Sequence, residues 1–406
     1  MQKLMLPFAV GVAGLLAAGG AVAGKPLFAD HAGKADPRNE RALETLLSNP
    51  STRGVRIVDV DASASDGDAI EVMLGNRPFE LQRDHTRFTD RGSQVWVGHV
   101  AGARGGPLNE AVLVNRDDRI TGNIRIDGQL YRIRPLPDGS TAVIEVDESR
   151  MPADHEVEPY EQLLSRADRQ RTTTAGTTET ASALAGSQTI RVMVVATDEA
   201  VSSYGGDMEA LIELAVAETN QGYANSNVDI SLELASYSTT SYSESGSFST
   251  DLARFRGTGD GYMDDIHALR DASNADVGMI VLDNSGSCGL ASGIGSNAST
   301  AFASVYWDCA TGYYSFGHEI GHLQSARHDP ANDRSSTPYA YGHGYQDPNR
   351  KWRTIMAYNC RGKGCPRLNY WSNPAVNYNG APMGTTSTSH NQRVLEETRV
   401  SVGGFR

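Results

Sequence analysis

The sequence predicts two folded parts, an all-β N-terminal domain and then an α/β domain with a mostly parallel mixed sheet. Between about residues 55 and 147, apolar and polar residues alternate with period two, which is typical of antiparallel strands. From residue 190 to 282 the pattern runs strand, helix, strand, helix, strand, which is typical of a parallel sheet. A threonine-rich stretch at residues 166–178 breaks all periodicity between them and is expected to be an exposed linker.

Individual elements follow from the local patterns. In the first part the strand candidates are residues 56–60, 94–97, 124–126 and 142–146. In the second part we expect strands at 190–196, 228–234 and 277–282 and helices at 207–221 and 262–273. The strand at 277–282 is apolar throughout, as in a sheet that is covered on both faces.

Length and composition limit the possible classes of protein. The 406 residues suggest two or three domains, and 39% hydrophobic against 21% charged residues supports a buried core. With 36 basic and 49 acidic residues the formal charge is −13. Because phosphate backbones and anionic membranes attract basic surfaces, we expect neither nucleic acid nor a membrane as a partner.

The first 23 residues have the pattern of a secretory signal peptide. Lys3 precedes an apolar run that ends in Ala21-Val22-Ala23, a small-x-small cleavage site. The alternative is a single membrane anchor, but no basic stop-transfer cluster follows the run. We therefore divide the chain into a signal peptide at 1–23, a β-rich domain with its linker at 24–175 and a second domain at 176–406, and expect secretion.

The four cysteines, which all lie in the second half, agree with export. An even number of cysteines in an exported chain predicts two disulfides with three possible pairings. We favour Cys288–Cys309 and Cys360–Cys365 because short closures form easily. A cysteine zinc site is the alternative, but the close CxxC pairs that such sites use are missing.

A histidine motif predicts a metal site. His318 and His322 lie four residues apart, so on a helix their imidazoles share one face, and Glu319 stands beside the first of them. If the chain then turns, His328 becomes a third ligand. Three histidines suit Zn²⁺ and leave a fourth position for water, as in a catalytic site.

This segment resembles the metzincin signature HExxHxxGxxH, which a methionine turn follows. The candidate for that turn is Thr354–Tyr358, with Met356 28 residues after His328. Asp329 directly after the third histidine resembles the reprolysin branch, and the stretches 369–374 and 380–384 resemble secreted bacterial members, the peptidyl-Asp metallopeptidases above all. The resemblance implies a metzincin-like α+β zinc endopeptidase domain with one catalytic zinc ion, and Met356 beneath the imidazoles.

Two residues depart from the resemblance. Ser325 stands where the family has glycine, at a helix end where a positive φ is expected. Tyr358 resembles a tyrosine of astacins and serralysins that approaches the zinc, and its phenol is a candidate donor to a developing oxyanion. Glu319 is the candidate general base, which accepts a proton from the attacking water.

Residues 351–367 contain five basic and no acidic side chains. In metzincins the segment after the methionine turn forms a wall of the pocket for the residue after the cleaved bond, the P1′ residue. A basic wall suits an acidic P1′ side chain and agrees with the cleavage before Asp that the resemblance implies. Our candidates for this wall are Arg361, Lys363 and Arg367.

The β-rich domain resembles a propeptide that inhibits its own enzyme, so the expected partners are protein or peptide substrates and this propeptide. It has no cysteine that could bind the metal, whereas a carboxylate of Asp147, Glu148, Asp154 or Glu156 could occupy the open metal position. His155 is expected to be a surface or turn residue.

Three alternatives stay open. The chain could be a secreted binding or adhesion module that carries zinc without proteolysis, or a metzincin with no acidic preference. Asp329, Asp333 and Asp347 could hold Ca²⁺, although no calcium-loop signature surrounds them.

Overall fold

The computed structural model describes residues 24–33, 36–103, 106–155, 160–162 and 186–406. The signal peptide and the threonine-rich linker that the sequence predicts lie outside these residues, so both stay predictions. No helix among the described residues is long and apolar enough to cross a membrane.

The N-terminal part is one ten-stranded sheet with the strand order β1-β4-β5-β6-β7-β8-β9-β10-β3-β2. Every strand pair is antiparallel except β1 with β4. Its core gathers residues such as Trp96, Leu113 and Ile124 on one face. Its strands are β1 (Lys25–Pro26), β2 (Phe28–Asp30), β3 (Thr52–Val60), β4 (Ala69–Leu74), β5 (Arg77–Phe88), β6 (Gln94–Val100), β7 (Glu110–Arg116), β8 (Arg119–Ile126), β9 (Gln129–Pro135) and β10 (Thr141–Val146), with helix α1 (Glu40–Ser48) before β3.

The second part is a mixed α/β domain, as the sequence predicts. Its five-stranded sheet has the order β12-β11-β13-β15-β14, in which only the edge strand β14 is antiparallel to its neighbour. The strands are β11 (Gln188–Thr197), β12 (Ile230–Thr240), β13 (Val277–Leu282), β14 (Gly289–Ala291) and β15 (Phe302–Tyr306), and β16 (Asn373–Tyr378) pairs separately with β17 (Ala381–Met383). The helices are α3 (Asp198–Tyr204), α4 (Met208–Asn225), α5 (Phe248–Arg256), α6 (Ile266–Ala272), α7 (Trp307–Ala310), α8 (Ser315–Leu323) and α9 (Asn391–Val402).

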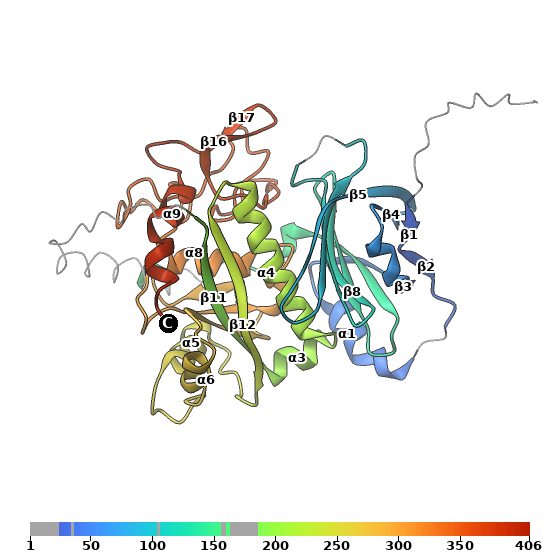
Figure 1. Cartoon of the computed structure of the whole chain (residues 1–406), viewed down its shortest axis with the longest axis horizontal. Coiled ribbons are helices and arrows are strands. Elements are labelled where there is room, and N and C mark those ends of the chain that lie inside the picture. Colours follow the sequence, from blue (N-terminus) through green and yellow to red (C-terminus); the bar gives the residue numbers. More distant parts are fainter. Residues whose placement is uncertain (1–23, 34–35, 104–105, 156–159, 163–185) are drawn as a thin grey trace, which may run out of the picture.

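Helix α4 lies between the two sheets and joins the two parts (Figure 1). Leu214 and Ala217 of this helix pack against valines of β6 and β7 in one buried cluster. Since α4 is buried on both sides, the apolar pattern over 207–221 marks a helix that runs through the centre of the molecule.

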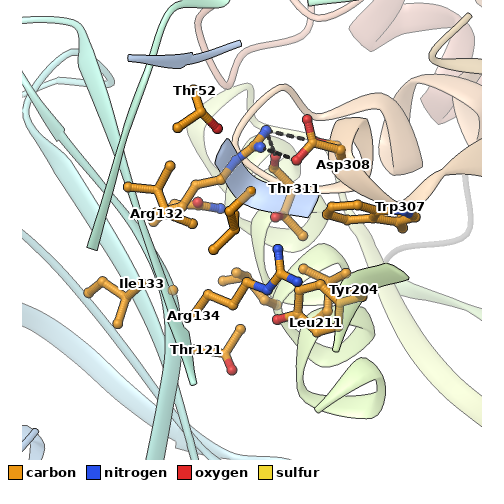
Figure 2. A pocket seen from close by; sticks show the side chains of 15 residues that line it. Thr52, Thr121, Arg132, Ile133, Arg134, Tyr204, Leu211, Trp307, Asp308 and Thr311 are labelled. Atoms are coloured by element: carbon orange, nitrogen blue, oxygen red, sulfur yellow. Dashed lines mark hydrogen bonds and ion pairs between the residues drawn. The ribbon is translucent and has the colours of Figure 1, made fainter. Parts of the chain in front are cut away.

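Polar contacts complete the boundary between the two parts. Arg132 of β9 donates to the Asp308 carboxylate at 2.6 Å, and the Arg134 guanidinium lies 4.5 Å from the centre of the Tyr204 ring (Figure 2). The second part thus covers one face of β8 and β9 with both apolar and charged groups.

Both favoured disulfides are present. Cys288 is bonded to Cys309 and Cys360 to Cys365, and no free cysteine remains. The first bond ties the start of β14 to α7, and the second closes the loop that follows Tyr358. The alternative of a cysteine zinc site is therefore wrong.

Candidate active site

Helix α8 places His318 and His322 on one face. Its other face buries Phe316, Ile320 and Leu323 in the core, which fixes the rotation of the helix about its axis. A side chain at Gly321 would lie 2.6 Å from the Trp371 ring and 3.2 Å from the Met356 sulfur, so glycine is required for this close approach.

The chain reverses directly after α8. Ser325 has a φ of 74°, as the sequence predicts for the helix end, and its N–H donates to the His322 carbonyl at 2.9 Å. Arg327 is then held by a buried ion pair with Asp333 at 2.9 Å. This anchoring brings His328 back over the two helix histidines.

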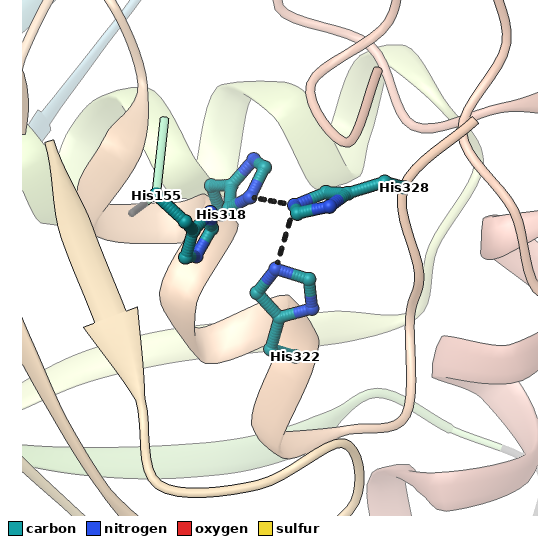
Figure 3. A group of neighbouring side chains, drawn as sticks. All are labelled: His155, His318, His322 and His328. Atoms are coloured by element: carbon teal, nitrogen blue, oxygen red, sulfur yellow. Dashed lines mark hydrogen bonds between the residues drawn. The ribbon is translucent and has the colours of Figure 1, made fainter. Parts of the chain in front are cut away.

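The three imidazoles converge through their Nε2 atoms (Figure 3). His328 Nε2 lies 3.1 Å from the Nε2 atoms of both His318 and His322. Nδ1 of His318 donates to the Ile355 carbonyl at 3.0 Å, and Nδ1 of His322 donates to the Ala326 carbonyl at 2.9 Å. Each of these rings therefore turns a bare Nε2 lone pair toward the other.

This donor set fits a zinc ion. Burial holds the pKa of all three imidazoles well below the ordinary value, so the rings are neutral and able to bind a metal. Three ring nitrogens at this spacing, two of them with bare lone pairs, suit a shared cation, and nitrogen ligands surround Zn²⁺ at about 2.0–2.1 Å. The carbonyl partners of Nδ1 fix the ring orientation, as is usual for metal-binding histidines.

Glu319 lies beside this cluster and faces strand β14. Burial and then the Asp154 carboxylate raise its pKa well above the usual value. A Cβ at Gly289 of β14 would lie 2.5 Å from Glu319 Oε1, so the strand approaches this carboxyl closely.

Met356 and Tyr358 line the cluster from the turn at 354–358. Met356 is fully buried, and Ile355 before it supplies the carbonyl that accepts from His318. The Tyr358 ring packs on the His328 ring, with 4.2 Å between the ring centres. Burial raises the pKa of the Tyr358 phenol far above its usual value, so it keeps its proton and can donate it in a hydrogen bond.

Of the three predicted basic wall residues, only Arg367 is buried. Arg361 and Lys363 are exposed on the loop between the cysteines. Arg367 lies beside Arg353, which the sequence analysis did not single out, and both guanidinium groups lie over the Tyr313 ring, at 4.4 and 5.3 Å from its centre. Backbone hydrogen bonds from Arg353 N to the Pro366 carbonyl and from Leu368 N to the Arg353 carbonyl hold the two segments together.

The N-terminal part reaches this site, and two of its side chains lie elsewhere than expected. Asp154 forms ion pairs with Arg367 and, at 3.5 Å, with Arg353, and it contacts no metal-site histidine. The side chain among the histidines is His155, which is 3% exposed and so is no surface residue.

The other carboxylates expected at the metal are also placed elsewhere. Glu148 pairs with Arg125 at 2.7 Å, and Asp147 caps a turn through Ser149. Glu156 lies outside the described residues.

The residues suggested for Ca²⁺ have protein partners instead. Asp333 pairs with Arg327, Asp329 accepts from the Tyr358 N–H at 2.9 Å, and Asp347 accepts from the Lys351 N–H at 3.0 Å. Within the described ranges, the one group of potential metal ligands is His155, His318, His322 and His328.

Comparison with known proteins identifies the family. Residues 186–372 match metallo-peptidase family M12. The chain is 52% identical to a peptidyl-Asp metalloendopeptidase of Xanthomonas campestris over 97% of both chains, and 53% identical to one of Stenotrophomonas maltophilia over 92% of this chain and 91% of that protein. A protein of the same name from Pseudomonas fragi is 52% identical over 47% of this chain and its own full length. The chain is therefore a metallopeptidase of family M12 and belongs with these peptidyl-Asp metalloendopeptidases.

Proposed function

We propose that this chain is the secreted precursor of a zinc endopeptidase that cleaves peptide bonds on the amino side of aspartate. His318, His322 and His328 hold the metal, and Glu319 is the general base. The observation that carries this proposal is the convergence of three imidazole Nε2 atoms, two of them bare, next to a buried carboxyl group.

Zinc, when bound, supplies a Lewis acid for the peptide carbonyl and lowers the pKa of a water molecule toward about 7. With the metal bound, Glu319 would accept the proton of the attacking water and then give this proton to the leaving amine. The Tyr358 phenol, held against the His328 ring, donates a hydrogen bond to the oxygen on which negative charge develops. Met356 provides the apolar floor that keeps the histidine rings in place.

Substitution of Glu319 tests the assignment of the base. Glu319→Gln keeps the shape of the side chain but removes its basicity, so we expect kcat/KM to fall by about 10²–10⁴-fold while zinc content stays at one ion per chain. His318→Ala is the contrasting variant, in which zinc itself should be lost. If Glu319→Gln keeps more than a tenth of the wild-type activity, Glu319 is not the base. If zinc-loaded, fully processed wild-type enzyme cleaves nothing, the result favours the alternative of a binding module.

The preference for aspartate is supported by the names of the relatives and by two buried cations. Arg353 and Arg367 are each about 1% exposed and converge on one carboxylate, that of Asp154. A pair of buried planar guanidinium groups suits a short carboxylate side chain. We therefore assign the P1′ pocket to Arg353 and Arg367, with Tyr313 as its wall.

Arg367→Met should reduce this preference. A charge-assisted hydrogen bond contributes about 1.5–3 kcal/mol, so the ratio of kcat/KM for matched peptides with Asp or Asn after the cleaved bond should fall by about 10–100-fold. The exposed Arg361 provides the control, because Arg361→Met should leave the ratio unchanged. An unchanged ratio in Arg367→Met would remove this residue from the pocket.

The N-terminal β domain is proposed to be the inhibitory propeptide, removed after secretion by cleavage in the linker. Its contacts with the site through Asp154 and His155 support this role. The N-terminus of secreted, active material provides the test: a start near residues 172–187 agrees with a propeptide, and a start near residue 24 would make the β domain a permanent part of the enzyme.

A further inference from the structure

We propose that residues 153–155 form an internal plug of the active site, in which Asp154 occupies the aspartate pocket and His155 gives the metal a fourth imidazole. This inference rests on the proposed function, since it names the residues that occupy the same site in the full chain. In the plug, the side chain of Asp154 imitates that of the substrate, and the imidazole of His155 takes the position of the attacking water.

The first half of the plug follows from charge and burial. Arg353 and Arg367 belong to the α/β domain, yet within the described parts of the chain the carboxylate that pairs with them is Asp154 of the N-terminal part. Two buried guanidinium groups need a negative partner, because an unpaired buried charge is strongly destabilising. When the N-terminal part leaves, this partner leaves too, and the acidic side chain of a substrate can replace it.

The second half follows from the position of His155. One nitrogen of its ring lies within 4.8 Å of the ligand nitrogens of the other three histidines, and the ring centres are 4.8–5.2 Å apart. The ring is buried, and a neutral imidazole has one lone pair to offer a metal. Its Nε2 also lies 3.2 Å from Glu319 Oε2, so His155 engages the carboxyl group of the proposed base as well.

The backbone explains why the plug is held without being cut. In cleavage before aspartate, the attacked carbonyl is that of the preceding residue. Here the Ala153 carbonyl accepts from the Cys288 N–H at 2.8 Å and the Asp154 carbonyl from the Gly289 N–H at 3.2 Å, which fastens the segment to the start of β14. The side chain that reaches the metal site is that of His155, which follows Asp154, whereas the carbonyl of Ala153 before Asp154 points to Cys288. The bond between Ala153 and Asp154 is therefore not placed as a substrate bond would be.

Tyr160 strengthens this cover. Its ring stacks on His328 with 4.2 Å between the ring centres, and its hydroxyl donates to Asp333 at 2.8 Å. Asp333 is the buried partner of Arg327, next to the third zinc ligand. The histidines are thus covered by residues 153–155 and also by Tyr160.

The metal half is tested on the intact full chain. His155→Phe keeps a ring of similar size but has no lone pair, and the matched control is His99→Phe, since His99 pairs with Asp84 far from the site. We expect His155→Phe to change the visible absorption spectrum of the Co²⁺-substituted chain and to raise the rate of zinc removal by a chelator at least tenfold, with His99→Phe like wild type. If both quantities stay at wild-type values in His155→Phe, His155 is not a ligand.

The pocket half is tested by latency, the ratio of peptidase activity after and before removal of the N-terminal part. Asp154→Asn should reduce latency at least tenfold, and Asp154→Glu, which keeps the charge and covers the case of a poorly folded Asp154→Asn, should retain more of it. Asp147→Asn, seven residues upstream and partly exposed, is the control without effect. Processed wild-type enzyme without activity would overturn the proposed function, whereas active processed enzyme with unchanged latency in both Asp154 variants would overturn the plug alone.

Discussion

The turn that returns His328 to the metal site holds Ser325 in the left-handed region, with a φ of 74°. A residue with a Cβ pays about 1–2 kcal/mol for this conformation, whereas glycine adopts it freely but loses more entropy on folding. We expect Ser325→Gly to raise the free energy of unfolding by about 1 kcal/mol and to leave activity unchanged, as measured by thermal and denaturant unfolding. Ser325→Ala keeps the Cβ and should give no such gain, and a melting temperature that stays equal or falls in Ser325→Gly would contradict the strain.

Single residues differ in how far the sequence reveals them. The spacing of His318 and His322 is tied to the period of one helix, so local sequence is sufficient to bring them together. His155 lies 164 residues before Glu319, and only the docking of one domain on the other brings the two together. Arg353 was missed for a related reason: a run of basic residues does not tell which side chains turn inward, and the backbone pairing of Arg353 with Pro366 and Leu368 decides it here.

Among the elements, the edge strand β14 has the most direct effect on the site. Gly289 leaves room for Glu319, since a Cβ there would lie 2.5–2.8 Å from the end of that side chain. Gly289→Ala should therefore displace Glu319 and lower kcat at least tenfold, with zinc content and overall fold kept because the end of a side chain can move. Gly404, near the C-terminus, is the control, because its added Cβ would lie 3.2 Å from the Val400 carbonyl and does not meet Glu319. Wild-type kcat in Gly289→Ala would show that Glu319 tolerates the displacement.

The element bounds show where local patterns are sufficient. The apolar strand expected at 277–282 has these bounds in the structure. Because the strand is buried on both faces, its apolar run begins and ends where the strand does. The helix expected from residue 262 begins only at Ile266, since Asp264 accepts from the N–H groups of Gly259 and Gly261 and forms a tight loop. Competition between side-chain and backbone hydrogen bonds of this kind is not visible in hydrophobic periodicity.

At the scale of the whole molecule, α4 presents its acidic side chains to the N-terminal sheet. Glu209 pairs with Arg116 at 2.7 Å, Glu213 accepts from Thr89 at 2.7 Å, and Glu218 accepts from Asn123 at 2.7 Å. The two domains thus meet through carboxylates that the N-terminal sheet covers. For Glu218, this burial makes the stability of the full chain dependent on pH.

The expected effect of Glu218 follows from its burial in the boundary between the two domains. Burial raises its pKa from 4.5 to about 7, so the folded chain binds this proton more tightly than the unfolded chain does. The stabilisation from this site is therefore complete below pH 4.5 and is lost as the pH rises through 7. Glu218→Gln does not titrate, so at pH 8 it should unfold with a free energy up to roughly 3 kcal/mol above that of wild type, and the difference should vanish near pH 4.5.

The amide that Glu218→Gln introduces would also keep the hydrogen bonds of this site. Its carbonyl can accept from the Gly312 N–H, which donates to Glu218 at 2.8 Å, and its NH₂ group can donate to Asn123 Oδ1 after a flip of the Asn123 amide. Glu209→Gln is the control on the same helix, because it removes the ion pair with Arg116 and should gain no stability at pH 8. Denaturant unfolding of the full chain from pH 4.5 to 8 measures both variants, and a difference between Glu218→Gln and wild type that does not grow with pH would place the pH dependence outside this domain boundary.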